Sequence, residues 1–477
     1  MSLETVTVIG GGLAGLSSAV ALAEAGVRVG VLEKRPHLGG RAASYDLPDG
    51  SHVDNCQHIT LGCCTNLDDF YRRVGAADKI HYYQRLYLAD AQGRRFEIAP
   101  SFLPPPFHLA LSLLGFRALS FADKRAVARA LLLIARFAGR PPDAAGATML
   151  EWLRRHAQNP GAIERFWRPV LVSALSEELN RASAQYGIDV FWKAYLSNRA
   201  GCRFGIPSVP LGELYSGVQA AIERRGGEVR FRATVREVVL EGDRVVALRL
   251  DDGSELRADA YISAVPQDAL PALLPREYAA RHEEFANLKN LQTSPITGVH
   301  FWFDRPVMQE PYLAVLDRTV QWIFNKTMLY PSCAGGSGQY LQLVISASHD
   351  LIAKSRQEII ELCRGELAEV LPSARTAELT KATVVKEVAA TFSPRPDSEA
   401  LRLGPDCAIS NLFLAGDWTR TGWPATMEGA VRSGYRAAEA VLTAAGNPRK
   451  FLQPDLPAQG FCRAWAKHRS EQQEARA

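Results

Sequence analysis

The chain has 477 residues, of which 47% are hydrophobic and 22% are charged, so it can bury a large core and divide into two or three domains. Its formal net charge of +4 is small for this length and excludes a broadly basic surface for nucleic acid, while a local basic patch that faces anionic lipid stays open. The cysteines are scattered without the spacing of a zinc site or a disulfide framework, so we expect reduced thiols and no metal site.

The first predicted element is a strand over 6–9 that runs into a glycine-rich turn and then an alanine-rich helix. The first glycine permits a tight bend, the second lets the backbone approach a pyrophosphate, and the third allows the helix to pack on the strand; the helix start offers N–H groups to the anion. This order predicts an adenine-dinucleotide site, and it leaves no cleaved export signal, so we expect a cytoplasmic protein. The expected cofactor contacts in this turn are Gly10, Gly12, Leu13, Ala14 and Gly15.

A second predicted strand ends at Glu33, whose carboxylate can accept hydrogen bonds from both hydroxyls of an adenosine ribose. We include the neighbouring Lys34 in the cofactor site. Two adjacent glycines, Gly39 and Gly40, then bring backbone against a ligand, and Arg41 is placed to pair with phosphate oxygens. A nicotinamide dehydrogenase would normally continue with another strand and helix, so this loop favours a flavin.

A second part of the same site lies near the other end of the chain. A buried strand from Asn411 ends in a Gly-Asp pair, and an alanine-rich helix follows to about Ala445. We expect the aspartate to bind a ribityl hydroxyl, and the helix start to offer N–H groups and a positive dipole to the electron-rich edge of an isoalloxazine. The expected cofactor contacts here are Gly416, Asp417, Met427, Glu428 and Ala430.

These two ends resemble the superfamily of FAD enzymes that contains the amine oxidases, protoporphyrinogen oxidases and carotenoid desaturases. The resemblance implies FAD and an α/β fold in which a discontinuous, Rossmann-like FAD-binding domain carries an inserted α+β substrate domain with a largely helical cap. The expected FAD-binding domain covers 1–88, 205–286 and 387–447, the substrate domain covers 89–204 and 287–386, and the C-terminal tail covers 448–477. Alternating strands in the middle piece predict a β-meander, in which the resemblance has Val235 present its backbone to the adenine.

The substrate domain is rich in aromatic residues and poor in acids, which suits a long hydrocarbon, although ordinary core packing explains such runs equally well. The pocket residues that we select are Trp322, Phe324 and Trp423. The segment 101–138 is apolar but carries five basic residues, so it suits either burial or a peripheral contact with the cytoplasmic membrane face. Its charges leave no apolar span of about 18 residues, and we reject a transmembrane helix.

Three separated motifs, at 54–64, 322–325 and 416–429, narrow the resemblance to the squalene-associated, FAD-dependent desaturase family. These are the hydroxysqualene dehydroxylases of bacterial hopanoid (triterpenoid) biosynthesis. The resemblance implies that hydroxysqualene and reduced FAD give squalene, FAD and water. An allylic alcohol leaves as water when it is protonated, and the delocalised carbocation is quenched by hydride on a face shielded from solvent.

This reaction needs a proton donor beside the hydroxyl. His58 is the candidate, because its segment is expected to pass beside the flavin ring and an imidazolium is the most accessible acid near neutral pH. Asp54 would orient His58 or tune its pKa, since residues four apart in a strand share a face. The alternative is that both residues only hold the turn around the flavin. Gln57 and His58 are also expected to contact the cofactor.

Other classes stay open. A carotenoid desaturase of the phytoene type shares the hydrocarbon pocket, a flavin amine oxidase shares the cofactor domain, and a lipid-binding flavoprotein is the non-enzymatic alternative. The glycine run 335–338 predicts a loop rather than a second nucleotide site, so the electron donor is unidentified. The tail is expected to be a frayed polar end unless it touches membrane or a partner, and the oligomeric state has no signature.

Overall fold

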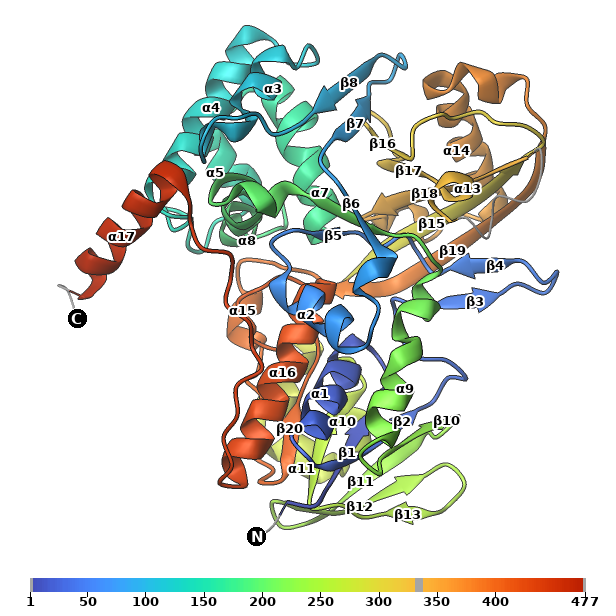
Figure 1. Cartoon of the computed structure of the whole chain (residues 1–477), viewed down its shortest axis with the longest axis vertical. Helices are drawn as coiled ribbons and strands as arrows, with labels where there is room; N and C mark the ends of the chain where they lie inside the picture. Colours follow the sequence, from blue (N-terminus) through green and yellow to red (C-terminus); the bar gives the residue numbers. More distant parts are fainter. Residues whose placement is uncertain (1–2, 331–337, 475–477) are drawn as a thin grey trace.

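The computed structural model describes residues 3–330 and 338–474. Its lower half in Figure 1 is built on a five-stranded parallel sheet in the order β10-β2-β1-β14-β20. The strands are β1 (Thr5–Ile9), β2 (Arg28–Glu33), β10 (Glu228–Phe231), β14 (Ala260–Ser263) and β20 (Leu412–Leu414). They come from three separate regions of the chain, which confirms the predicted α/β, Rossmann-like architecture.

Both faces of this sheet are covered, which is why β1 and β2 are so apolar. On one face, α1 packs between α16 and α9; on the other lies the predicted meander, followed by three short helices. The elements are α1 (Leu13–Glu24), α9 (Ser216–Glu223), α16 (Met427–Ala444), β11 (Val235–Glu241), β12 (Arg244–Leu250), β13 (Glu255–Leu256), α10 (Leu270–Leu273), α11 (Arg276–Arg281) and α12 (Glu283–Ala286).

The helices α1 and α16 approach at backbone distance. A Cβ atom on Gly434 would lie 2.2 Å from the carbonyl oxygen of Ala14 and 2.1 Å from Oγ of Ser17. Ser17 also donates a hydrogen bond of 3.3 Å to the carbonyl of Val431. Small residues therefore hold together the two helices whose N-terminal ends are expected to face the cofactor.

The second unit is built on a seven-stranded sheet in the order β19-β15-β18-β17-β16-β7-β8, antiparallel except between β16 and β7. Its strands are β7 (Leu86–Ala89), β8 (Arg95–Ile98), β15 (Thr293–Phe303), β16 (Tyr312–Val315), β17 (Trp322–Asn325), β18 (Gln339–Ser346) and β19 (Leu379–Phe392). The boundaries expected at 88 and 387 fall inside β7 and β19, because both strands continue across them. Residues 335–337 of the glycine run lie outside the described residues.

The remaining strands connect the two units, and helices cover the sheets. The strands are β3 (Ser44–Asp46), β4 (His52–Asp54), β5 (Thr60–Leu61), β6 (Ile80–Tyr83) and β9 (Phe204–Pro207). The helices are α2 (Thr65–Arg73), α3 (Ala110–Gly115), α4 (Phe121–Arg136), α5 (Met149–Arg155), α6 (Pro160–Ala162), α7 (Arg168–Leu175), α8 (Ala184–Val190), α13 (Lys326–Leu329), α14 (Arg356–Val370), α15 (Ser398–Leu401) and α17 (Gly460–Glu474). In Figure 1, α3 to α8 form a helical layer at the upper left. Among the described residues, no helix combines the length and apolarity needed to cross a bilayer.

The start of the C-terminal tail is packed, so the expectation of a frayed end is wrong for this part. The backbone carbonyl of Gln453 accepts a hydrogen bond from Nδ2 of Asn66 at 3.1 Å, and the backbone N–H of Gln453 donates to Oδ1 of Asn66 at 2.8 Å. Asp455 forms ion pairs with Arg432 of α16 and, at 3.1 Å, with Lys193 of the helical layer. The contacts with Asn66 and Lys193 were invisible in the sequence because they join residues 387 and 262 positions apart.

The contact between α1 and α16 predicts that Gly434→Ala lowers the free energy of unfolding by about 1–3 kcal/mol, because the new methyl group meets backbone that cannot rotate away. Thermal unfolding measures this loss, and flavin absorbance measures the FAD retained. Gly365→Ala is the control: Gly365 lies inside α14 with open space around its Cβ position, so alanine should stabilise by about 0.5–1 kcal/mol. Equal Tm values for the two variants would contradict the packing argument.

Candidate active site

Two glycine loops face each other at the carboxyl edge of the parallel sheet. Gly12 and Gly39 form a β-bridge, and the N–H of Gly39 donates to the carbonyl of Gly11 at 2.8 Å. A Cβ atom on Gly40 would lie 3.1 Å from Cα of Gly12, and φ is +60° at Gly40. Backbone therefore lines this cradle, as binding a diphosphate through N–H groups requires. The predicted residues brought together here are Gly10, Gly12, Leu13, Ala14, Gly15, Gly39 and Gly40.

The end of β2 forms the expected adenosine side of the cradle. The buried carboxylate of Glu33 accepts hydrogen bonds from the N–H groups of Gly11, at 2.7 Å, and Arg35, at 2.8 Å. The N–H of Ala233 donates to the carbonyl of Glu33 at 3.0 Å, which brings the start of β11 at Val235 to the same edge. Lys34, by contrast, is exposed.

Arg41 joins the two ends of the chain. Its Nη2 lies 2.5 Å from Oδ1 of Asp417, and its Nη1 donates to the carbonyl of Ala390 at 2.6 Å. Burial opposes the charge on Arg41, but the Asp417 carboxylate outweighs burial and raises the pKa of the guanidinium. Asn55 donates to the carbonyl of Arg41 at 2.9 Å and to the Glu387 carboxylate at 3.2 Å. The sequence did not indicate this carboxylate partner, and the expected pairing of Arg41 with phosphate oxygens stays a prediction.

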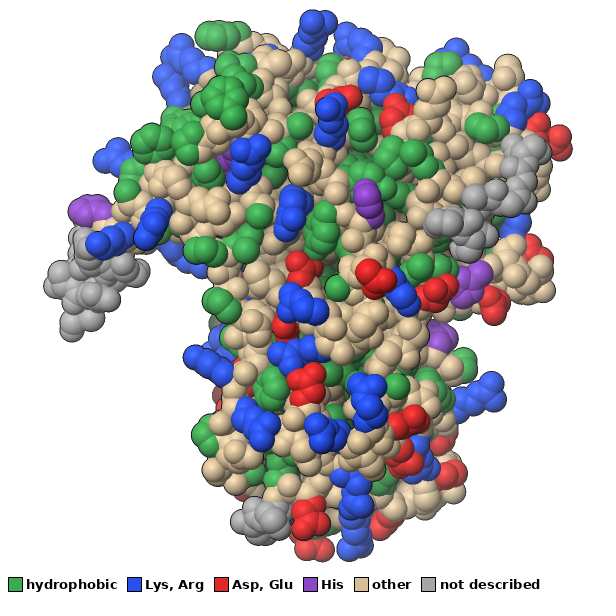
Figure 2. Space-filling view, viewed as in Figure 1, with side chains coloured by type: hydrophobic (Ala, Val, Ile, Leu, Met, Phe, Trp, Pro, Cys, Tyr) green, Lys and Arg blue, Asp and Glu red, His purple; other side chains and the backbone are tan. Residues whose placement is uncertain are grey.

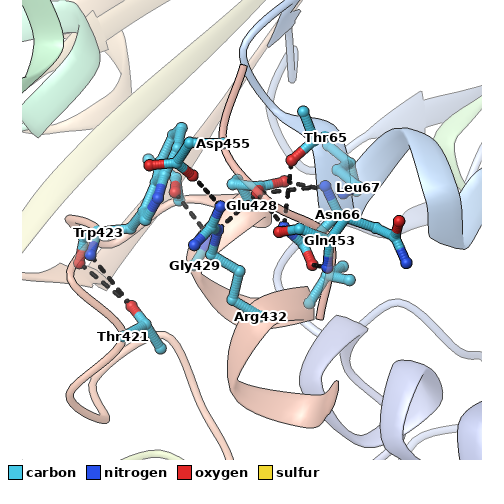
Figure 3. Close-up of polar contacts among 12 residues, drawn as sticks. Thr65, Asn66, Leu67, Thr421, Trp423, Glu428, Gly429, Arg432, Gln453 and Asp455 are labelled. Atoms are coloured by element: carbon cyan, nitrogen blue, oxygen red, sulfur yellow. Dashed lines mark hydrogen bonds and ion pairs between the residues drawn. The ribbon is translucent and has the colours of Figure 1, made fainter. Parts of the chain in front are cut away.

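The start of α16 is fixed by its own side chains (Figure 3). Thr426 accepts a hydrogen bond from the N–H of Gly429 at 3.0 Å. The carboxylate of Glu428 is fully buried and accepts from Leu67 N–H at 2.8 Å, from Asn66 at 2.9 Å and from Arg432 at 2.7 Å. Because this side chain holds α2, only the backbone of Glu428 is left for a cofactor contact.

A fully buried arginine positions the neighbouring loop. The guanidinium of Arg402 donates to the carbonyls of Asp417 and Trp418, both at 3.2 Å, and of Thr419. Its Nη1 also pairs with Glu399 at 2.9 Å. Arg402 thus fixes the turn that carries Asp417, and no motif in the sequence indicated it.

A buried ion pair lies where the two units meet. Nζ of Lys326, at the start of α13, lies 2.7 Å from Oδ2 of Asp54, and both side chains are 1% exposed. Lys326 also donates to Oε1 of Gln57 at 2.7 Å, while Tyr330 and Ser44 donate to Asp54 at 2.6 and 2.7 Å. Burial opposes ionisation of Asp54, but Lys326 and these hydrogen bonds outweigh it and lower the pKa to about 2.

Further polar groups lie beside this pair, which lines a cavity of about 520 Å³. His300 and Gln342 are partners on β15 and β18, and both are fully buried. Burial lowers the pKa of His300 to about 3, so the ring is neutral. Within the described part of the chain, Nε2 of His300 and Oε1 of Gln342 have no hydrogen-bond partner. Unsatisfied buried polar atoms are rare and often mark a ligand site.

His58 lies in a loop rather than in the expected strand, because β4 ends at Asp54 and β5 begins at Thr60. Its Nδ1 donates to the carbonyl of Cys56 at 2.9 Å, which leaves Nε2 as the basic nitrogen. Burial lowers the pKa of His58, and the charge of Asp54 only partly offsets this. The expectation that Asp54 orients His58 is wrong, since its carboxylate is held by Lys326.

The three aromatic residues selected for the pocket do not share one place. Trp322 and Phe324 stack with ring centres 5.8 Å apart, and Nε1 of Trp322 donates to Ser173 at 2.7 Å. Trp423 instead packs in the core of the FAD unit, with the cations of Lys193 and Arg432 4.5 and 5.0 Å from its ring centre. Only Trp322 and Phe324 therefore stay candidates for a common apolar wall.

Comparison with known proteins decides the family. The model of the flavin containing amine oxidoreductase family matches residues 13–442. The chain belongs to this family. The zeta-carotene desaturase of Synechocystis is 27% identical over 473 residues, which cover 92% of this chain and 97% of that protein. The 15-cis-phytoene desaturase of Capsicum annuum is 26% identical over 456 residues, covering 92% of this chain and 77% of that protein.

Solved structures of this flavin enzyme's fold agree. An oxidoreductase from Methanosarcina mazei superimposes with a TM-score of 0.71 at 19% identity, covering 90% of this chain and 99% of that one. Putrescine oxidase superimposes with a TM-score of 0.68 at 16% identity, covering 92% and 99%. These structures show the same fold. The family match and the curated relatives confirm the resemblance to the amine oxidase and carotenoid desaturase superfamily, so the chain is an FAD-dependent oxidoreductase.

The residues present fit FAD. The glycine cradle presents backbone rather than side chains to a diphosphate, Glu33 lies at its adenosine end, and the loop of Gly416 and Asp417 meets Arg41 at the other end. The oxidoreductase also has residues that we did not select from the sequence, chiefly Lys326 and Arg402. The sequence did contain a pattern that could have indicated Lys326, because this lysine directly follows the apolar strand β17. For Arg402 we find none.

The buried pair predicts that Lys326→Met costs roughly 3–5 kcal/mol of unfolding free energy at neutral pH, because it leaves the Asp54 carboxylate without its cation. The pKa of Asp54, about 2, lies below its ordinary 3.8, so the pair stabilises the fold above about pH 4 and loses this effect as the pH falls towards 2. Denaturant unfolding at several pH values measures both effects.

Two further variants control this test. Asp54→Asn combined with Lys326→Met removes both charges and should recover part of the loss. Arg249→Ala breaks an ion pair with Glu237 in which both side chains are more than 40% exposed, so it should cost at most about 1 kcal/mol. The assignment fails if Lys326→Met and Arg249→Ala cost the same.

Proposed function

We propose that this FAD-dependent oxidoreductase removes the hydroxyl of hydroxysqualene reductively and gives squalene, as a step of hopanoid biosynthesis. The observation that carries the proposal is the buried polar cluster of Asp54, Gln57 and Lys326 beside the aromatic pair Trp322 and Phe324 on neighbouring β17. A substrate with a long apolar chain and one hydroxyl would match the cavity next to this cluster, which Asp54 and Lys326 line together with apolar groups such as Trp302 and Phe303.

The polar side of this lining argues for an oxygen-bearing substrate. Burying charged and polar groups is costly, and a pocket for a pure hydrocarbon gains nothing from them. Here Nε2 of His300 and Oε1 of Gln342 have no partner among the described residues, and Gln342 lies against the backbone of Asp54. A hydroxyl can donate to Oε1 of Gln342, and it can hydrogen-bond to Nε2 of His300 in either tautomer of the ring, as donor or as acceptor.

The apolar side supports the rest of the substrate. The ring centre of Phe204 lies 6.1 Å from that of Trp322, which in turn stacks on Phe324, so three aromatic rings lie together in the core around β17. Such faces bind a hydrocarbon and stabilise a nearby cation, and loss of an allylic hydroxyl creates a delocalised cation.

The dehydroxylation balances in atoms and electrons with one molecule of hydroxysqualene and one reduced FAD. Reduced FAD supplies a hydride, the substrate hydroxyl leaves with a proton as water, and an unidentified electron donor must reduce the cofactor again. His58 is the proton donor that we propose, acting through Nε2, because Nδ1 is held by Cys56. The reaction would require the bound substrate to keep water away from the cation, which water would otherwise capture.

Carotenoid desaturation is the second candidate, and the curated relatives favour it. That reaction runs in the opposite redox sense, since the hydrocarbon is oxidised. Incubating the purified holoenzyme with hydroxysqualene and a reductant, and separately with phytoene and an electron acceptor, distinguishes the two by product analysis. Squalene in the first reaction is the expected result; desaturated phytoene without any squalene would overturn the proposal.

His58→Gln is expected to keep bound FAD and to lower the rate of squalene formation by roughly 10²–10⁴-fold, because glutamine cannot donate a proton as an acid. For the wild type, the rate should fall as pH rises through the pKa of His58, which burial holds below 6.5. Single-turnover rates across pH measure both effects. His81→Gln, which changes an exposed histidine on β6 away from the cavity lining, is the control and should behave like wild type. Full turnover by His58→Gln would refute the role.

A further inference from the structure

One corner of the helical layer exposes large apolar side chains. Phe102 is 81% exposed, Phe121 is 79% exposed and Leu114 is 64% exposed. In Figure 2, hydrophobic side chains gather over α3 and α4 at the upper left, with Lys and Arg around them. We call this surface the α3–α4 face, and its other exposed apolar residues are Phe107, Leu111, Leu132 and Phe461.

The helical spacing of α3 and its contacts with the preceding segment keep these apolar side chains exposed to solvent. Phe107, Leu111 and Leu114 follow helical spacing and are exposed, whereas His108 between them is fully buried. The hydroxyl of Ser112 bonds the backbone of Ala99 at 3.0 and 2.7 Å, which fixes the approach to α3. The exposure therefore belongs to a packed element.

The charge on this face is of one sign. Along α4, Phe121 and Leu132 share a side with the exposed cations Arg125, Arg129 and Arg136. Between residues 99 and 140 the sequence contains a single acid, Asp123. Its carboxylate accepts from the N–H and the hydroxyl of Ser120 at 2.9 and 2.7 Å, as the cap of α4. The face thus presents apolar groups and cations together.

We propose that the α3–α4 face docks on the surface of a lipid bilayer that contains anionic lipid. Phenylalanine and leucine enter the boundary between head groups and acyl chains, and arginines pair with lipid phosphates. A second copy of this chain fits less well, because a symmetric contact would bring the same cations together.

Docking of the α3–α4 face on a bilayer does not depend on which substrate the enzyme takes. On the inner side of the same layer, buried residues of α4 and α7 belong to the core cluster that contains Trp322 and Phe324. A bilayer at the α3–α4 face would lie next to the helices that cover the aromatic wall.

The test is flotation of the FAD-loaded protein with vesicles of phosphatidylcholine alone and with added phosphatidylglycerol. Binding is expected to the anionic vesicles and to weaken in high salt. Phe102→Ser with Phe121→Ser should lower the partition coefficient on the order of a hundredfold. Arg125→Gln with Arg129→Gln should lower it roughly thirtyfold on anionic vesicles only.

The matched control carries Phe231→Ser and Val388→Ser, two exposed apolar residues outside the α3–α4 face. It should bind as wild type does, and flavin absorbance should be equal in all variants. Equal binding of control and face variants, or no binding of the wild type to either vesicle, would overturn the proposal. So would a lipid-free dimer that only the face variants dissociate, because that result assigns the face to self-association.

Discussion

The buried ion pair between Asp54 and Lys326 constrains the whole meeting of the two units. A charge buried this deeply is stable only when its partner is in place. The end of β4 and the residue after β17 must therefore pack against each other in the folded protein. Gln57, Tyr330 and Ser44 complete the set of hydrogen bonds. The pair fixes the loop with His58 against the seven-stranded sheet, and the proposed chemistry depends on this register.

The ion pair between Arg41 and Asp417 fixes two distant loops against each other at the expected cofactor site. They join a loop after β2 to a turn after β20, and Arg402 holds that turn from behind. The FAD unit is therefore closed by contacts between chain segments that are hundreds of residues apart. The glycine cradle alone would not define where the flavin end lies.

Sequence reasoning succeeded where structure is local. The turn at Gly10, the acid that ends β2 and the start of α16 are each set by neighbouring residues, and each was predicted within a few positions. It failed where a contact spans the fold. Lys326 lies 272 positions from Asp54, so the true partner of that carboxylate could not be read, and His58 was assigned instead. Trp423 was grouped with Trp322 by residue type, although they occupy different cores.

The C-terminal tail has a consequence for how the two sides of the enzyme move. Asp455 pairs with Arg432 on α16, the helix that begins at the expected flavin end (Figure 3). It also pairs with Lys193, in the helical segment Phe191–Leu196 that follows α8. Because the Asp455 carboxylate pairs with a cation on each side, it ties α16 of the FAD unit to the helical segment that follows α8. Any opening of the helical layer away from the FAD unit must first release one of these cations, so substrate entry by a wide hinge motion carries an electrostatic penalty.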